Sequence, residues 1–245
     1  MKKLVLSLLI IGLVNVSFAQ KKGKSEPAPT KSIESGVSKE FDLQKSIMRR
    51  ALKYNDAVAA KNALFNMIAM QPESKNLVDS LAILYYQMGS YTECILVARE
   101  ILEESPDKTG ILEIKAISEQ NLGLAKLALE DYEALYPVTK NIYHLYQIAT
   151  LQYDLKRFGE ADLTIQALLA DEKVDETKIQ VFLGQGQSQQ VPMKAGIYNM
   201  QGMLLLNINK EAEAKAKFEE ALKLDEKFVL PKNNLAAMKK AKEGK

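Results

Sequence analysis

The stretch KNLVDSLAILYYQMGSYTECILVAREILEESPDK, residues Lys75–Lys108, decides the fold of this chain. Its apolar residues recur every three or four positions, which is the spacing of one buried face of an α-helix. Gly89 interrupts the pattern, and glycine adopts the left-handed conformation that ends a helix at little cost. Pro106 stands near the end, where a second helix must stop because proline cannot continue a helix interior. The stretch therefore predicts two helices joined by a tight turn.

Small residues on the two apolar faces indicate close packing between these helices. Ala82 lies in the first helix and Cys94 in the second. Helix axes approach to about 8–10 Å only where the contacting side chains are small. Cys94 is also the only cysteine of the chain, so it cannot form an intramolecular disulfide. We expect it to be a buried structural thiol.

The same pattern recurs along the chain. A small residue opens the second helix of each copy, at Ala60, Cys94, Ala128, Ala161 and Ala214. Successive members of this set are 34, 34, 33 and 53 residues apart. Four positions after each of these residues stands another small or apolar residue, at Leu64, Ala98, Tyr132, Ile165 and Phe218. The register predicts five helical hairpins, with an insertion of about nineteen residues before the last.

These repeats resemble the tetratricopeptide repeat (TPR) family, whose unit has the same length and a similar residue pattern. The likeness is strongest in the second and fifth units, which carry Tyr85, Gly89, Tyr91, Ala98 and Pro106, and Tyr198, Gly202, Ala214, Phe218, Ala221 and Leu222. It implies an all-α fold, a right-handed α-solenoid of about five hairpins, with repeats at about 41–74, 75–108, 109–141, 142–175 and 195–228. A lysine-rich helix at 229–242 with one apolar stripe is expected to cap the solenoid.

The first and third units depart from the family pattern. Asn55 replaces the turn glycine of the first unit, and asparagine also tolerates the left-handed conformation. The third unit has Lys115 and Glu119 where apolar residues are expected. Its Pro137 arrives three residues early, so we expect its second helix to be about one turn shorter.

The insertion at 176–194 does not have the spacing of a helix. Ile179 and Val181, and then Leu183, alternate with polar residues, which is typical of a strand, and the stretch 184–186 contains two glycines suited to a turn. These features predict a small β-hairpin with a returning strand at 189–192. The alternative is a disordered loop, which the abundance of glutamine favours.

The first nineteen residues have the features of a signal peptide. A positive start at Met1–Lys3 precedes an apolar run at 4–14, and small residues precede the expected cleavage after Ala19. The alternative is an uncleaved anchor, but the apolar run is shorter than the ~20 residues that span a bilayer. We therefore expect export, to the periplasm or the exterior, with no membrane insertion after cleavage. Residues 20–39 are polar and are expected to form a flexible linker.

Charge and residue content argue against several functions. The net charge is +2, and removal of residues 1–19, which carry two lysines and no acids, makes it zero, so nucleic acid is not an expected partner. His144 is the only histidine, which excludes multi-histidine metal sites, and a surface or packing role is expected for it. No phosphate-binding glycine loop or nucleophile with a companion base is evident. We expect no catalytic residues, no cofactor and no metal.

The resemblance implies a concave groove lined by the first helix of each repeat. Carried over position by position, it gives as partner-binding candidates Tyr86, Tyr143, Tyr146, Tyr153, Lys45, Arg49 and Asn199. Tyrosine is enriched where proteins bind proteins, although tyrosines also fill gaps between repeats. Some family members clamp a peptide carboxylate with Lys and Asn residues of adjoining repeats, a pattern that Asn76 and Ser80 do not complete.

The leading hypothesis is a non-enzymatic, exported scaffold that binds a protein or peptide through the groove and the inserted hairpin. The alternative is a structural protein that uses the same repeat surfaces to form a homo-oligomer. Nothing in the sequence identifies the partner.

Overall fold

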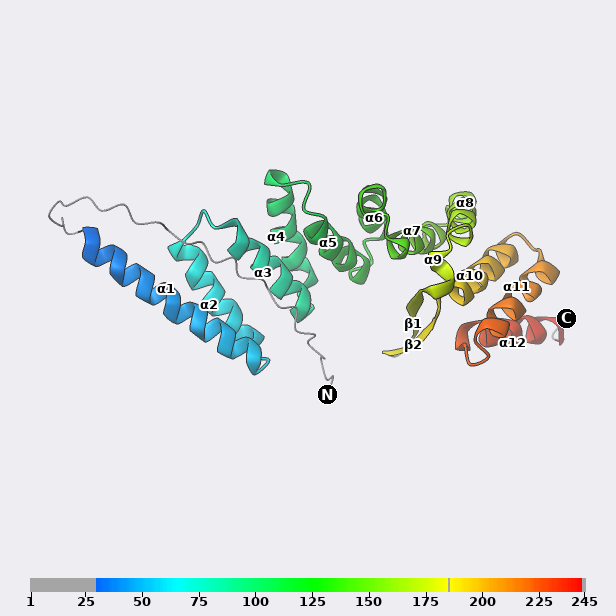
Figure 1. Ribbon diagram of the computed structural model, residues 1–245. Coiled ribbons are helices and arrows are strands. Elements are labelled where there is room, and N and C mark those ends of the chain that lie inside the picture. The colour runs from blue at the N-terminus through cyan, green and yellow to red at the C-terminus, as the bar shows by residue number, and fades with distance from the viewer. Residues whose placement is uncertain (1–29, 185, 244–245) are drawn as a thin grey trace. The chain divides into compact units, whose positions relative to one another are not determined.

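The computed structural model describes residues 30–184 and 186–243, and these form two compact units. Unit 1 ends at Ile114 and unit 2 begins at Lys115, within one helix. The described residues are mainly helical, and consecutive helices are antiparallel hairpins (Figure 1). No helix in these ranges is long and apolar enough to cross a bilayer.

Unit 1 contains two complete hairpins and the beginning of a third. Its helices are α1 (Thr30–Lys53), α2 (Ala57–Met70), α3 (Lys75–Met88), α4 (Tyr91–Glu104) and the first part of α5 (Thr109–Asn121). Small and branched residues from neighbouring hairpins form its core, which includes Ala60, Leu64, Leu81, Ala82, Ala98, Ile101 and Ile111. Cys94 is fully buried and its thiol lies 4.0 Å from the Ile114 carbonyl, so the expected buried thiol is confirmed.

The turns of unit 1 have the conformations that the sequence indicates. Gly89 ends α3 with φ 71°, and its N–H donates to the Tyr86 carbonyl. Ser90 then donates to the Tyr85 carbonyl over 2.9 Å, which completes the bonding of the helix end. Asn55 has φ 57°, so it takes the left-handed conformation expected of a substitute for glycine.

Unit 2 contains the later hairpins, the insertion and the last helix. Its elements after α5 are α6 (Ala125–Thr139), α7 (Ile142–Asp154), α8 (Phe158–Leu169), α9 (Lys173–Glu176), β1 (Lys178–Gly184), β2 (Gln187–Pro192), α10 (Met193–Asn207), α11 (Glu211–Leu224) and α12 (Val229–Glu243). Large buried side chains such as Tyr132, Ile165 and Phe218 occupy the repeat positions identified in the sequence. The insertion is an ordered antiparallel hairpin, as expected, preceded by the short helix α9, which was not expected.

Two local predictions differ from the structure. The second helix of the third repeat is not shortened, because α6 continues through Pro137 to Thr139. Proline in the last turn removes only one N–H, and the Thr139 hydroxyl donates to the Leu135 carbonyl there. Residues 30–39, expected to belong to the linker, are the start of α1. No proline interrupts that segment, so the helix propagates although its side chains at 36–40 are exposed.

Candidate interaction surface

Three of the predicted tyrosines lie on α7, on one stripe of the helix. Asn141 caps this helix, since its side-chain oxygen accepts from the Tyr143 N–H over 3.0 Å. Tyr143, Tyr146 and Tyr153 are spaced by three and seven residues, which keeps them on one face. Tyr143 is exposed, at 37%, whereas the other two are partly buried.

Tyr146 packs inside unit 2 rather than standing free on a groove wall. Its hydroxyl would lie 3.2 Å from a Cβ at position 196, so α7 and α10 are close at this point. Burial raises the pKa of Tyr146 to about 12, because the charged phenolate would lose its hydration. Tyr146 therefore contributes to the internal packing between α7 and α10.

Tyr153 and Tyr86 also take part in contacts within their units. The Tyr153 hydroxyl accepts from the Asn207 amide over 3.2 Å, and its ring centroid lies 5.6 Å from that of Phe158. These contacts link α7 to α8 and α10. In unit 1 the Tyr86 and Tyr91 rings are 6.5 Å apart, at the junction of α3 and α4.

Asn199 is buried, with 5% of its surface exposed. Its side-chain oxygen accepts from the Asn234 amide over 3.0 Å, which joins α10 to α12. The last helix therefore covers the position that the family pattern assigns to the groove. Asn199 holds the cap helix in place and does not line an open surface.

The hairpin is fixed to the repeats of unit 2 by packing on α10. Ile179 is buried, and its Cδ1 would lie 2.5 Å from a Cβ at position 196, a contact that only glycine allows. At the base of the hairpin, Lys194 pairs with Asp175 over 2.6 Å. A lone two-stranded hairpin is only marginally stable in water, and packing on α10 supplies the support that this one needs.

A second anchor joins β2 to the connection between α11 and α12. The Gln189 amide donates to the Lys227 carbonyl over 3.0 Å, and its oxygen accepts from the Val229 N–H over 3.0 Å. Sequence reasoning missed both Gln189 and Gly196. Gly196 could have been recognised as a glycine inside a helix, away from any turn. Nothing in the local sequence distinguishes Gln189 from its neighbouring glutamines.

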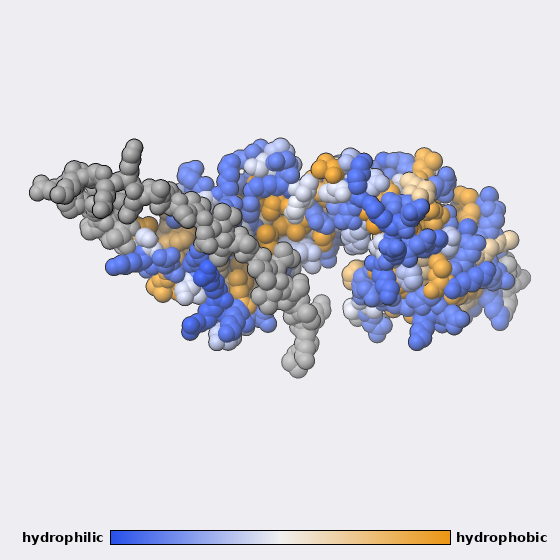
Figure 2. Space-filling view, in the orientation of Figure 1, coloured by the Kyte–Doolittle hydropathy of each residue, from blue (hydrophilic) through white to orange (hydrophobic). Residues whose placement is uncertain are grey.

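The face drawn in Figure 2 is mainly hydrophilic, and exposed large apolar side chains are scattered over both units. In unit 2 the most exposed are Phe182 on β1, at 80%, Val138 at 72% and Leu163 on α8, at 67%. Phe182 lies near the turn of the hairpin, on the side opposite to the buried Ile179 and Val181. The hairpin thus has one face against its own helices and one face in solvent.

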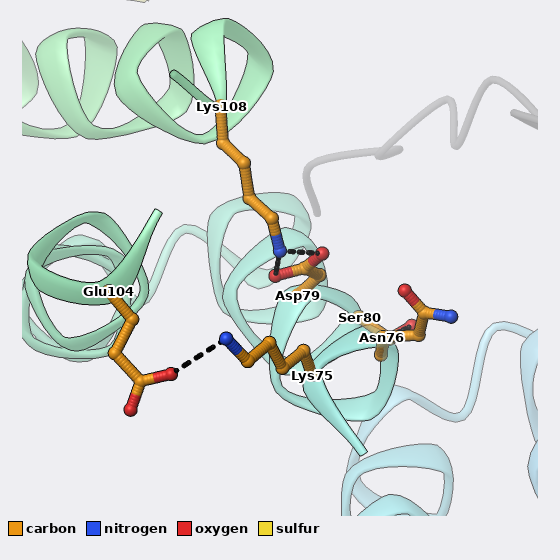
Figure 3. Close-up of polar contacts among 6 residues, drawn as sticks. All are labelled: Lys75, Asn76, Asp79, Ser80, Glu104 and Lys108. Carbon is orange, nitrogen blue, oxygen red and sulfur yellow. Dashed lines mark hydrogen bonds and ion pairs between the residues drawn. The ribbon is translucent and has the colours of Figure 1, made fainter. Parts of the chain in front are cut away.

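A cleft in unit 1 contains charged groups that neutralise one another. Lys108 binds both carboxylate oxygens of Asp79, at 2.7 and 2.6 Å, and Lys75 pairs with Glu104 at 3.2 Å (Figure 3). The Ser80 hydroxyl donates to the Asn76 carbonyl over 2.7 Å, so it is engaged with its own helix. Lys45 and Arg49 lie on α1, partly buried and exposed respectively. This cleft does not present the lysine and asparagine arrangement of a carboxylate clamp.

The two polar residues of the third repeat belong to a buried charged cluster. The Lys115 ammonium lies 3.0 Å from Glu119 and 2.6 Å from Asp131, and all three side chains are at most 13% exposed. Burial, and then the nearby negative charge of Asp131, raise the pKa of Glu119, while Lys115 opposes the shift. These residues replace apolar packing by an internal ion network.

His144 has a packing role within unit 2. It is 1% exposed, its Nδ1 lies 2.9 Å from the Thr139 hydroxyl, and its ring centroid lies 5.7 Å from that of Tyr132. The contact joins the end of α6 to the start of α7. The side chain is enclosed by protein and does not reach the exposed surface.

No family model matches the chain, and no curated protein matches it. Solved structures are similar. One is YrrB, described as a TPR protein with an unusual peptide-binding site, with a TM-score of 0.63 and 14% identity over 86% of this chain and 97% of that one.

Another is MamA from residue 41 onward, from Desulfovibrio magneticus RS-1, with a TM-score of 0.59 and 13% identity over 76% of this chain and 96% of that one. A further MamA crystal structure has a TM-score of 0.60 and 12% identity over 78% and 94%. At these identities the likeness concerns the fold. Together with the repeated helical hairpins, it shows that the chain has the TPR fold, an α-solenoid.

Proposed function

We propose that the protein is a non-enzymatic scaffold that holds a segment of a protein partner against the α7 face of unit 2. The observation that carries the proposal is the tyrosine stripe of α7, in which Tyr143 is exposed and Tyr146 and Tyr153 are fixed by internal contacts. A tyrosine on a rigid helix, such as Tyr143, loses little side-chain entropy on binding and offers both apolar contact and a hydrogen bond.

The hairpin supports this assignment because it packs on α10, the helix that also lies against Tyr146. Ile179 lies against α10 close to the Tyr146 hydroxyl, so the hairpin and the tyrosine stripe are parts of one packed structure. The likeness to YrrB, a TPR protein with a peptide-binding site, agrees with a partner that is a peptide segment. Asn199 is not included, since α12 covers it.

Export is a further part of the proposal and rests on the sequence alone. Residues 1–19 lie outside the described residues, and their signal-peptide pattern supports a location in the periplasm or outside the cell. Detection of mature protein beginning at Gln20 in an exported fraction would support this part. An intact N-terminus in the cytoplasmic fraction would contradict it.

The binding proposal is tested with a matched pair of variants. The partner is first identified by crosslinking and mass spectrometry in the native host, and its dissociation constant is then measured with purified proteins. Tyr143→Ala should weaken binding about tenfold or more, because a central aromatic anchor contributes more than 1 kcal/mol. Leu163→Ala, a change at a more exposed apolar side chain on α8, should leave binding unchanged. Equal affinities of wild type and Tyr143→Ala would contradict the assignment of the α7 face.

A further inference from the structure

The hairpin has an edge that no strand covers. β1 and β2 form a two-stranded sheet, so within the described residues each strand has a single strand partner. An uncovered edge presents backbone N–H and C=O groups that can pair with another strand. The turn of the hairpin points away from α10 (Figure 1).

The register determines which backbone groups face outward. The Met193 N–H donates to the Thr177 carbonyl over 2.8 Å, so these two residues form a hydrogen-bonded pair. Hydrogen-bonded and non-hydrogen-bonded pairs alternate along an antiparallel ladder. The next hydrogen-bonded pairs are therefore Ile179–Val191 and Val181–Gln189, and the pairs between them direct their backbone groups away from the partner strand.

On β1 the residues whose backbone groups point away from β2 are Lys178, Gln180 and Phe182. All three side chains are exposed, on the face of the hairpin opposite to α10. Within residues 30–184 and 186–243, none of their N–H or C=O groups bonds to the backbone of another segment. These residues form a regular edge, which ends at the irregularity between Phe182 and Gly184.

We propose that this edge pairs with the same edge of a second copy of the chain, antiparallel and centred on Gln180. In that register Gln180 lies opposite Gln180 of the other copy, and Lys178 lies opposite Phe182. The three opposed pairs exchange about six backbone hydrogen bonds. If the two strands are shifted so that the free backbone groups still face one another, fewer residues are opposed and fewer hydrogen bonds form.

The side chains on this edge are complementary under the two-fold relation. Each Phe182 ring meets the Lys178 side chain of the other copy, an apolar stem that ends in a cation suited to an aromatic face. Lysine commonly blocks a strand edge, but this register never opposes two lysines. The Gln180 amide donates to the Ser188 hydroxyl on its own hairpin.

The edge of β2 is less suited to the same role. Its outward residues include Pro192, which has no N–H to donate, and the other two are the polar residues Ser188 and Gln190. One short edge buries less than the ~1,200 Å² of stable complexes. The pairing is therefore expected to be a reversible dimer that forms as concentration rises.

Site-specific disulfide formation tests the pairing directly. Residues of a hydrogen-bonded antiparallel pair have Cα atoms about 5.5 Å apart, within the range that a disulfide bridges. Gln180→Cys should yield a covalent dimer under mild oxidation. Gln190→Cys, its exposed cross-strand neighbour on β2, should remain monomeric, and the native Cys94 is buried and does not interfere. Equal crosslinking of the two variants, or none of the first, would overturn the proposal.

A charge exchange tests the register without a covalent bond. Sedimentation equilibrium should show dimerisation of the wild type, and Phe182→Lys should weaken it about tenfold or more by opposing two lysines. Lys178→Glu combined with Phe182→Lys should restore it, because each glutamate then faces a lysine. A wild type that is monomeric at all concentrations, a dimer insensitive to Phe182→Lys, or absence of rescue would each overturn the register. Tyr143→Ala should leave dimerisation unchanged, which separates this pairing from partner binding.

Discussion

At the scale of single residues, two glycines inside α10 leave space that side chains from other segments occupy. A Cβ at position 202 would lie 2.4 Å from the Phe218 ring, and one at position 196 would lie 2.5 Å from Ile179. The first glycine lets the two helices of the fifth repeat pack closely. The second lets the hairpin pack directly on α10, where a methyl group would push Ile179 away.

Gly196→Ala should therefore destabilise unit 2 by about 1–3 kcal/mol, the usual cost of inserting a group into a filled core. Urea unfolding measures the change, and hydrogen exchange should locate the loss of protection in β1 and β2. Gly159→Ala on α8 is the control, because nothing lies within 4 Å of its Cβ position, and this change should be neutral or slightly stabilising. Equal effects of the two variants would contradict the contact.

The cluster of Lys115, Glu119 and Asp131 gives a second prediction at this scale. Lys115→Met leaves two buried carboxylates without their cation and should cost about 3–5 kcal/mol. Lys215→Met, which removes an exposed ion pair with Glu219, should cost less than about 1 kcal/mol.

The pH dependence of the cluster has a defined sign. The folded state raises the Glu119 pKa above its ordinary value of 4.5, so it favours the protonated form. Glu119 therefore contributes most to the free energy of unfolding below pH 4.5. This contribution is lost as the pH rises from there through the raised pKa. The free energy of unfolding of the wild type, relative to that of Glu119→Gln, should fall over this interval. A difference that does not change with pH would contradict the shift.

At the scale of elements, the sequence indicates those features whose cause is local. The step of small residues from Ala60 to Ala214 predicts the helical hairpins, and alternation around Ile179 and Val181 predicts the β-hairpin. Helix α9 and the first two residues of β2 lie outside the predicted elements, because the sequence there has no periodic apolar pattern. Pro137 predicts an early end of its helix, but in a last turn it removes only one hydrogen bond and the helix continues.

The Gln189 anchor shows how a distant contact fixes an element. Its amide makes two hydrogen bonds to the α11–α12 connection, about forty residues later in the chain. Gln189→Ala should cost about 1–3 kcal/mol, since it removes both bonds and leaves a backbone N–H unsatisfied. Gln190→Ala, a change of the same kind at an exposed neighbour, should be within about 0.5 kcal/mol of wild type. A loss of similar size in both would contradict the anchor.

At the scale of the whole molecule, the chain consists of two compact units built from one repeated hairpin, and the binding proposal concerns the second unit. The tyrosine stripe of α7 could be identified from spacing and family resemblance. That Tyr146 and Asn199 serve internal packing could not, because α10, which lies against Tyr146, and α12, which covers Asn199, are remote from them in sequence or not predicted to lie there. The proposed site is therefore the part of the predicted surface that remains exposed, at Tyr143.

The most direct test places a photoreactive phenylalanine analogue at single positions and identifies what it captures in the native host. With the analogue at Tyr143, we predict crosslinks to one segment of one partner protein. With the analogue at Leu163, on α8 of the same unit and more exposed, that crosslink should be absent. The same segment captured from both positions, or from Leu163 alone, would contradict binding at the α7 face.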